Sequence, residues 1–401
     1  MDYKRCNWPD FFENNQTVFY TAAIFIGIAL ACFPSISKFF DAALKFVLPI
    51  LLFVTFLQVP FASVVKSFRN GRFIAGLLVG NFILIPVLVF LLIRLGLSFL
   101  NSLLNMSPLS KLTSANDPYL YFTAFGAMLL CAPCVDYVVS FCRSGKGDIA
   151  ALTAALPVLL IFQFCFLGFL FVSPFAGTKL PGLGHQSLSI LLRSVFEVLI
   201  IPICLAWFLQ RFSSRNRMIS VSTSFMKNSV VIVTSLTLVI LATYAFSQIF
   251  SIFGGDCHGL TTKMPSHNVV GQLTNGDSLT THADGFGGVC ENRKLFGALL
   301  YGIVFYGIYG CLAPFIGLLA AKLLRLHEKQ AIAVSFSVST RNSLVLLPLL
   351  LFITPASAQT LVALVILTQT CVELVAEVFY VRLIPLFAKK HFGHQESGCE
   401  Q

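Results

Sequence analysis

Residues 129–148 read LLCAPCVDYVVSFCRSGKGD, and residues 335–351 read SFSVSTRNSLVLLPLLL. These two stretches carry the main sequence evidence for the fold. Pro133 removes a helix hydrogen bond, so a helix must kink or open between Ala132 and Asp136. The second stretch holds polar residues that no lipid-facing helix would tolerate: Ser337, Ser339, Thr340, Arg341, Asn342 and Ser343. Paired interruptions of this kind are typical of inverted-repeat membrane proteins whose site lies where broken helices cross.

The composition around these stretches is that of a polytopic membrane protein. Of 401 residues, 57% are hydrophobic and only 11% are charged, against about 25% charged in an average soluble domain. The mean hydropathy of +0.84 excludes a disordered chain. No phosphate-binding GxxxxGK[ST] motif occurs, so ATP is not expected to drive the protein directly. We expect no cofactor, no bound metal and no nucleic-acid partner.

Ten apolar segments approach the roughly 20 residues that a bilayer-spanning helix needs. We therefore predict an all-α membrane protein with two inverted five-helix repeats, residues 18–172 and 188–387, whose fourth and ninth helices are broken. Residues 1–17 and 388–401 form polar tails. The predicted spans are Val18 to Phe33, Phe39 to Val65, Phe73 to Leu100, Pro118 to Phe141, Ile149 to Val172, Leu188 to Gln210, Ser229 to Phe253, Leu295 to Leu324, Ala331 to Phe352 and Leu361 to Phe387.

The distribution of basic residues predicts the orientation. With both termini in the cytoplasm, 17 of the 27 Lys and Arg residues fall on the cytoplasmic side and six fall outside. The net charge of +10 is accordingly a topology signal, and an inner or plasma membrane is the expected location. The polar insertion from Gly254 to Asn292 then lies outside. Its Cys257 and Cys290 form either a disulfide or two free thiols.

Ionisable residues within predicted spans are functional candidates, because each costs at least about 2.5 kcal/mol to insert. They are Asp136 in the fourth span, Glu197 in the sixth, Arg341 in the ninth, and Glu373 with Glu377 in the tenth. The two glutamates share one helix face, where they repel unless one is protonated or both meet a cation. A proton-coupled carrier could use such a pair. The alternative is a structural pairing with a buried arginine.

The sequence resembles the superfamily that contains the bile acid:sodium symporters and the arsenite-resistance permeases. The resemblance rests on APCxxxVxxFxxxGKGD ending at Asp148 and on SxSTRNSLxxLPL ending at Leu349. It runs from FLQVPF, residues 56–61, to CVELVAEVFYVRLIP, residues 371–385, with the insertion as the exception. It implies ten spans in which the fourth and ninth helices cross, and a secondary transport activity.

Within that superfamily the chain is more similar to the arsenite-permease branch. The positions that carry a Ser-Asn sodium ligand pair in the symporter branch fall on Val138 and Val139, which lack side-chain oxygens. The functional cysteine of the arsenite branch falls on Cys134, whose soft thiolate suits a trivalent metalloid. One difference from that branch is the absence of an acidic residue from Asn342 to Leu346.

These observations predict a secondary transporter, not an enzyme, that moves a small anion or oxyacid, with arsenite efflux as one candidate, by proton coupling. Arg341 would attract the anion. Asp136, Glu373 or Glu377 would carry the proton. Cys134 would line the substrate site or ligate the substrate. Sodium-coupled uptake of an organic anion is the main alternative; an ion channel and a membrane thiol enzyme using Cys131 and Cys134 are others. The predicted substrate-binding residues are Cys134, Asp136, Thr340, Arg341, Asn342 and Ser343.

Overall fold

The regular structure of the chain is helical, as the composition predicts. The computed structural model describes residues 15–58, 70–104, 118–135, 137–172, 201–213, 221, 223–226, 229–253, 284–343, 345–347, 350 and 359–392, and no strand forms within them. A helix satisfies its backbone hydrogen bonds internally, which a lipid environment demands. The helices among these residues that are long and apolar enough to cross a membrane are Gly71–Gly96, Ile149–Phe166, Val230–Ser247, Leu295–Leu323 and Gln359–Phe392.

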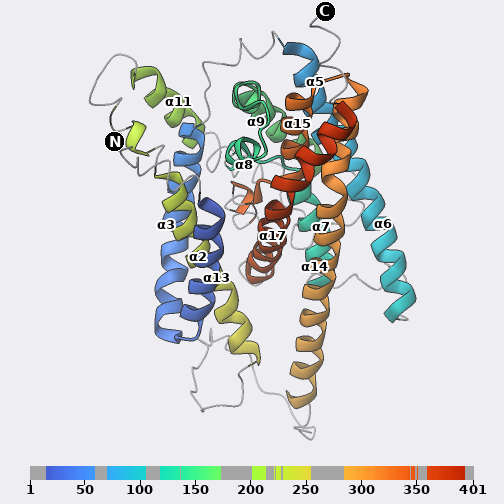
Figure 1. The fold of residues 1–401 in the computed structure, drawn as a ribbon. Coiled ribbons are helices and arrows are strands. Elements are labelled where there is room, and N and C mark those ends of the chain that lie inside the picture. The colour runs from blue at the N-terminus through green and yellow to red at the C-terminus, as the bar shows by residue number, and fades with distance from the viewer. Residues whose placement is uncertain are drawn as a thin grey trace, which may run out of the picture.

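The helices form two groups that pack side by side (Figure 1). The first group lies on the left in Figure 1 and consists of α2 (Gln16–Ala31), α3 (Pro34–Gln58), α11 (Ile201–Ser213) and α13 (Val230–Phe253). The second consists of α5 (Gly71–Val79), the π-helical turn η3 (Gly80–Leu84), α6 (Ile85–Leu104), α7 (Pro118–Leu130), α8 (Val138–Ser144), α9 (Ile149–Val172), α14 (Asp284–Leu323), α15 (Glu328–Ser339) and α17 (Gln359–Phe392). Helix α17 contacts α2 and α13 and so joins the groups.

Small residues let α2 and α13 approach closely within the first group. A Cβ atom on Gly27 would lie 2.6 Å from the Cβ atom of Ala242 and 2.6 Å from the carbonyl oxygen of Val239. Close backbone approach permits the Thr243 hydroxyl to donate to the Gly27 carbonyl at 3.1 Å. Glycine at such a contact is how helices pack tightly where lipid supplies no hydrophobic drive.

The outer faces of the helices carry large apolar side chains. Phe46 is 73% exposed, Leu386 is 69% exposed and Phe25 is 67% exposed. In contrast, arginine, glutamate and amide side chains are buried between the helices. This arrangement, with apolar groups outward and polar groups inward, is expected of a helical membrane protein.

The structure confirms the two predicted interruptions. The fourth predicted span contains α7 and α8, and the described residues between them, 131–135 and 137, are not helical. The ninth predicted span contains α15, which ends at Ser339, and helical structure resumes at Ser343. Asp136 and Pro348 lie outside the described residues.

Helix boundaries agree with the predicted spans to different degrees. Helix α9 has the predicted limits, Ile149 and Val172. Helix α14 differs, because it begins at Asp284 rather than at Leu295, so the end of the predicted loop is helical. Once a helix has formed, each added residue gains a backbone hydrogen bond, so it extends past its apolar part. Cys290 therefore belongs to α14, whereas Cys257 lies outside the described residues.

Candidate functional site

The two interrupted helices meet through their backbones. We call this region the crossover and define it as residues 131–135 and 137 together with residues 340–342. The Cys134 amide donates to the Thr340 carbonyl at 3.2 Å, and the Asn342 amide donates to the Ala132 carbonyl at 2.9 Å. Pro133 and Arg341 form an isolated antiparallel bridge between these bonds. Backbone groups that the broken helices leave without helical partners are thus paired across the crossover.

The side chain of Arg341 is fully buried and donates to the ends of both broken helices. Its Nη1 donates to the carbonyl of Leu130, the last residue of α7, at 3.1 Å. Its Nη2 donates to the carbonyl of Ser337 at 3.2 Å and also to the carbonyl of Val338, both in the last turn of α15. The guanidinium carbon lies 5.7 Å from the ring centroid of Tyr309. Arg341 therefore caps two helix C-termini, where a positive charge is favoured.

Asn81 supplies a further acceptor for Arg341 from the π-helical turn η3. The Ile85 amide bonds back five residues to the Gly80 carbonyl, and Pro86 follows without an N–H to donate. The widened turn directs Asn81 toward α15, where its Oδ1 accepts from the Arg341 Nη2 at 3.1 Å. The Asn81 amide nitrogen donates in turn to the Ser337 hydroxyl at 3.2 Å.

Glu373, on α17, is the main acceptor for donors of the crossover. Its Oε1 accepts from the backbone N–H of Arg341 at 2.6 Å and from the Tyr137 hydroxyl at 2.9 Å. Its Oε2 accepts from the Gln369 amide at 2.5 Å. The Tyr137 hydroxyl lies also within 3.0 Å of the Arg341 carbonyl. Charge-assisted hydrogen bonds of this kind are stronger than neutral ones, so Glu373 ties α17 to both unwound segments.

Glu377 lies one helical turn beyond Glu373 and is fully buried. Neither of its carboxyl oxygens has a hydrogen-bond partner among the residues that the structure describes. A small cavity with room for about one water molecule lies beside this turn. Glu373, Gln369, Tyr309 and Ser339 contribute to its wall. A buried carboxyl without a partner is costly, and an ionisable group at membrane depth is a candidate functional residue.

The polar residues that follow Arg341 contact the fifth and tenth spans. The amide nitrogen of Asn342 lies 3.5 Å from Oε1 of Gln163 on α9. The Ser343 and Thr370 hydroxyls are 3.0 Å apart. The Asn342 Oδ1 and Gln163 Nε2 atoms are buried and have no hydrogen-bond partner in the portion of the chain that the structure describes. This side of the crossover therefore presents one free acceptor and one free donor, both uncharged.

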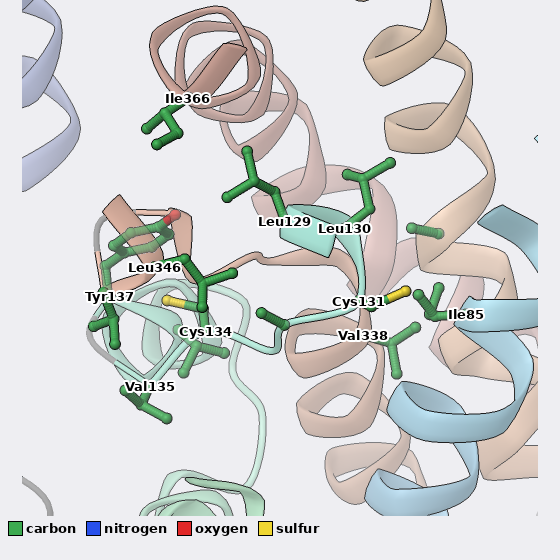
Figure 2. Packing of buried hydrophobic residues seen from close by; sticks show 14 of the residues in the cluster. Ile85, Leu129, Leu130, Cys131, Cys134, Val135, Tyr137, Val338, Leu346 and Ile366 are labelled. Atoms are coloured by element: carbon green, nitrogen blue, oxygen red, sulfur yellow. The ribbon is translucent and has the colours of Figure 1, made fainter. Parts of the chain in front are cut away.

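The two cysteines of the unwound segment face different neighbours (Figure 2). The Cys131 sulfur points toward Ile85 and Val338, whereas the Cys134 sulfur points toward Tyr137. Both are buried and neither forms a disulfide. The CxxC spacing does not bring the two thiols together, because the helix is unwound between them.

The GKGD turn positions α8 and α9 against α15. Lys146 adopts a left-handed conformation with a φ of 61°, and the Gly147 amide bonds back to the Cys142 carbonyl at 2.9 Å. These bonds close the C-terminus of α8. Asp148 then accepts from the Ala151 amide at 3.0 Å, and its own amide donates to the Lys329 carbonyl near the start of α15.

The structure brings most of the predicted site residues together. Cys134, Thr340, Arg341, Asn342 and Ser343 meet at or beside the crossover, and Glu373 reaches it from α17. Asp136 and Glu197 lie outside the described residues. A sequence screen for ionisable groups does not select four uncharged polar residues of this site, Asn81, Tyr137, Gln163 and Gln369. For Asn81 and Gln163 the available signal was a lone amide within an apolar helix.

Among the described residues, no cluster of three His, Cys, Asp or Glu side chains could hold a metal ion. The described polar groups at the crossover can form hydrogen bonds, exchange a proton at the Glu373 carboxyl and present the positive charge of Arg341. No protein-family model matches the chain, and a search of curated proteins likewise gives no match.

Proposed function

We propose that the chain is a secondary active transporter that works by alternating access and couples the movement of a small anion or oxyacid to the proton gradient. Arsenite efflux is the first candidate to test. The protein would have ten spans in two inverted five-helix repeats and both termini in the cytoplasm of an inner or plasma membrane. Sodium-coupled transport of an organic anion is the alternative.

The observation that carries this proposal is the buried crossover itself. Unwound backbone within a membrane is tolerated where protein or a water-filled path surrounds it. Here two unwound segments pair, and buried polar atoms that have no hydrogen-bond partner within the described part of the chain lie near them: Arg341 Nε, Asn342 Oδ1, Gln163 Nε2, Gln369 Oε1 and both Glu377 oxygens. Broken helices that meet in this way form the substrate and ion sites of many secondary transporters.

The grouping of helices supports alternating access and internal repetition. The helices of predicted spans one, two, six and seven form the first group, and those of spans three to five and eight to ten form the second. Each five-span half therefore gives its first two helices to one group and its last three to the other. Repeats of this kind transport by moving one group against the other around a central site.

The substrate and proton assignments follow from the polar groups near the crossover. Carboxyl groups within a membrane are common proton carriers, and Glu373 lines the cavity beside Glu377. Asn342 and Gln163 offer an acceptor and a donor that suit a protonated oxyacid. The Arg341 charge favours an anion nearby, and Cys134 is a soft ligand for a metalloid.

The experiment is flux into proteoliposomes of arsenite, antimonite and a bile acid, with proton and sodium gradients imposed separately. We expect arsenite or antimonite flux that requires the proton gradient and is unchanged when potassium or choline replaces sodium. Glu373→Gln should abolish proton-driven flux, because the glutamine amide keeps a hydrogen-bond acceptor but cannot bind and release a proton. Glu328→Gln, on the half-buried first turn of α15, is the matched control and should retain flux. A strict sodium requirement would favour the alternative, and no flux of any of the three substrates would contradict the proposal.

A further inference from the structure

The Arg341 guanidinium lies among oxygen atoms that a broken helix leaves without partners. The last four carbonyls of a helix have no intrahelical donor. Leu130 is the last residue of α7, and Ser337 and Val338 belong to the last turn of α15. All three carbonyls accept from the guanidinium, and the Oδ1 of Asn81 is the fourth acceptor.

The position is electrostatically suited to a cation. Helix C-termini carry partial negative charge, and two of them converge here. Hard cations prefer carbonyl and amide oxygens, and half-helix C-terminal ends bind coupling cations in transporters with broken helices. The guanidinium is 0% exposed, and its hydrogen bonds within the described residues go to neutral oxygens.

We propose that Arg341 is a tethered cation: its guanidinium fills an oxygen-lined cation site formed by α7, α15 and Asn81. The chain then carries within itself the positive charge that a mobile coupling cation would otherwise bring to the crossover. The consequence for ion coupling rests on the proposed transport function. The cation site itself is tested without measuring transport.

The first test removes the side chain and returns the cation. Arg341→Ala retains the Cβ atom, and ethylguanidinium replaces the missing part of the side chain. Millimolar ethylguanidinium should raise the unfolding temperature of the detergent-purified Arg341→Ala protein in a saturable manner, whereas ethylammonium at the same concentration should raise it less. The wild type should show no such shift, because its site is filled.

Arg94→Ala is the matched control for this test. Arg94 lies in α6, is exposed, and has its guanidinium carbon 5.1 Å from the Phe90 ring centroid. Because Arg94 is exposed, its removal opens the position to solvent and creates no buried site, so ethylguanidinium should not shift the unfolding temperature of this variant. Absence of a saturable shift in Arg341→Ala, or an equal shift in Arg94→Ala, would overturn the proposal.

A second pair of variants covers the case in which Arg341→Ala does not fold. Arg341→Lys keeps a positive charge, whereas Arg341→Met keeps length without charge. The tethered-cation site requires a higher unfolding temperature, or a higher yield of folded protein in the membrane, for Arg341→Lys than for Arg341→Met. Equal values for the two variants, or a more stable Met variant, would overturn the proposal.

Flux measurements then extend the inference to coupling. Wild-type flux should be equal in sodium and in choline at constant ionic strength. Ethylguanidinium could raise the unfolding temperature of Arg341→Ala while wild-type flux depends on sodium. That combination would support the cation site but contradict the inference that Arg341 replaces a mobile coupling cation. Rescue by ethylguanidinium in a protein that transports none of the three substrates would contradict the proposed function alone.

Discussion

The break in the fourth span and the break in the ninth span lie side by side, but different parts of the chain keep them open. The fourth-span break contains Pro133, which lacks the N–H for a helical hydrogen bond and so favours an interruption at that point. Proline does not open a helix by itself, because Pro49, Pro157, Pro314 and Pro385 lie within continuous helices. The unwound residues of the ninth-span break are Thr340, Arg341 and Asn342, with no proline among them. There the Arg341 amide bonds to Glu373, and its side chain bonds to α7, α15 and Asn81.

This difference separates a local cause from a tertiary one. A proline acts through its own ring and missing N–H, so it weakens a helix locally and favours a break without enforcing one. The ninth-span break exists because partners on other helices satisfy the groups that unwinding exposes. We therefore expect the ninth-span break to be the more sensitive of the two to substitutions elsewhere in the protein.

The largest effect is expected for Glu373→Leu. The substitution leaves two buried donors, the Arg341 amide and the Gln369 amide, without their acceptor, and the Tyr137 hydroxyl keeps only the Arg341 carbonyl. The cost in folding free energy should be about 3–5 kcal/mol. Thermal unfolding in detergent would measure it, and Glu373→Gln, which keeps an acceptor, should lose less than half as much. Equal losses for Leu and Gln would mean that the carboxyl acceptor does not hold the break.

Asn81→Leu tests the side of the break that faces the third span. It removes the acceptor for the Arg341 Nη2 and the donor to the Ser337 hydroxyl. We expect a loss of about 2 kcal/mol in folding free energy, because a hydrogen bond to a charged group is broken. The control is Gln163→Leu, which removes a buried amide whose contact with Asn342 is long, at 3.5 Å. A control that is as damaging as Asn81→Leu would show that any buried amide matters equally.

Tyr137→Phe should have a smaller effect. The lost hydroxyl contacts the Arg341 carbonyl and the Glu373 carboxylate, so it joins the fourth-span segment to the ninth. Its removal should cost about 1–1.5 kcal/mol. Tyr121→Phe is the matched control, because the Tyr121 hydroxyl is also buried but has no partner. That control should be neutral or slightly stabilising; the reverse order of unfolding temperatures would exclude Tyr137 as the link.

The smallest effect is expected for Pro133→Ala. Without proline the local sequence favours a helix, but the Ala132 carbonyl and the Cys134 amide remain paired with Asn342 and Thr340. We expect a loss below about 1 kcal/mol, because the tertiary hydrogen bonds persist. The unfolding temperature would show this. A loss as large as that of Glu373→Leu would mean that proline, rather than pairing, maintains the crossover.

The two breaks also differ in how far the sequence could predict them. Pro133 predicted the fourth-span break. The polar run from Thr340 to Ser343 indicated that this part of the ninth span does not face lipid. The sequence offered an anion or a carboxylate as the partner of Arg341. The guanidinium instead bonds to the carbonyl of Leu130, 211 residues away, and to Asn81, 260 residues away.

The amino-acid sequence by itself determined the helical class, the limits of a helix such as α9, and the places where two helices are interrupted. Hydropathy and proline act over one or two turns, and a linear pattern records them directly. The tertiary structure alone decided which groups pair at the crossover. A buried polar atom bonds to whichever oxygen or nitrogen the packing of helices brings within about 3 Å, and that proximity is set by helices far apart in the chain. For this reason Asn81, an uncharged residue on a π-helical turn, is part of the site, and the Arg341 side chain caps the C-termini of two helices.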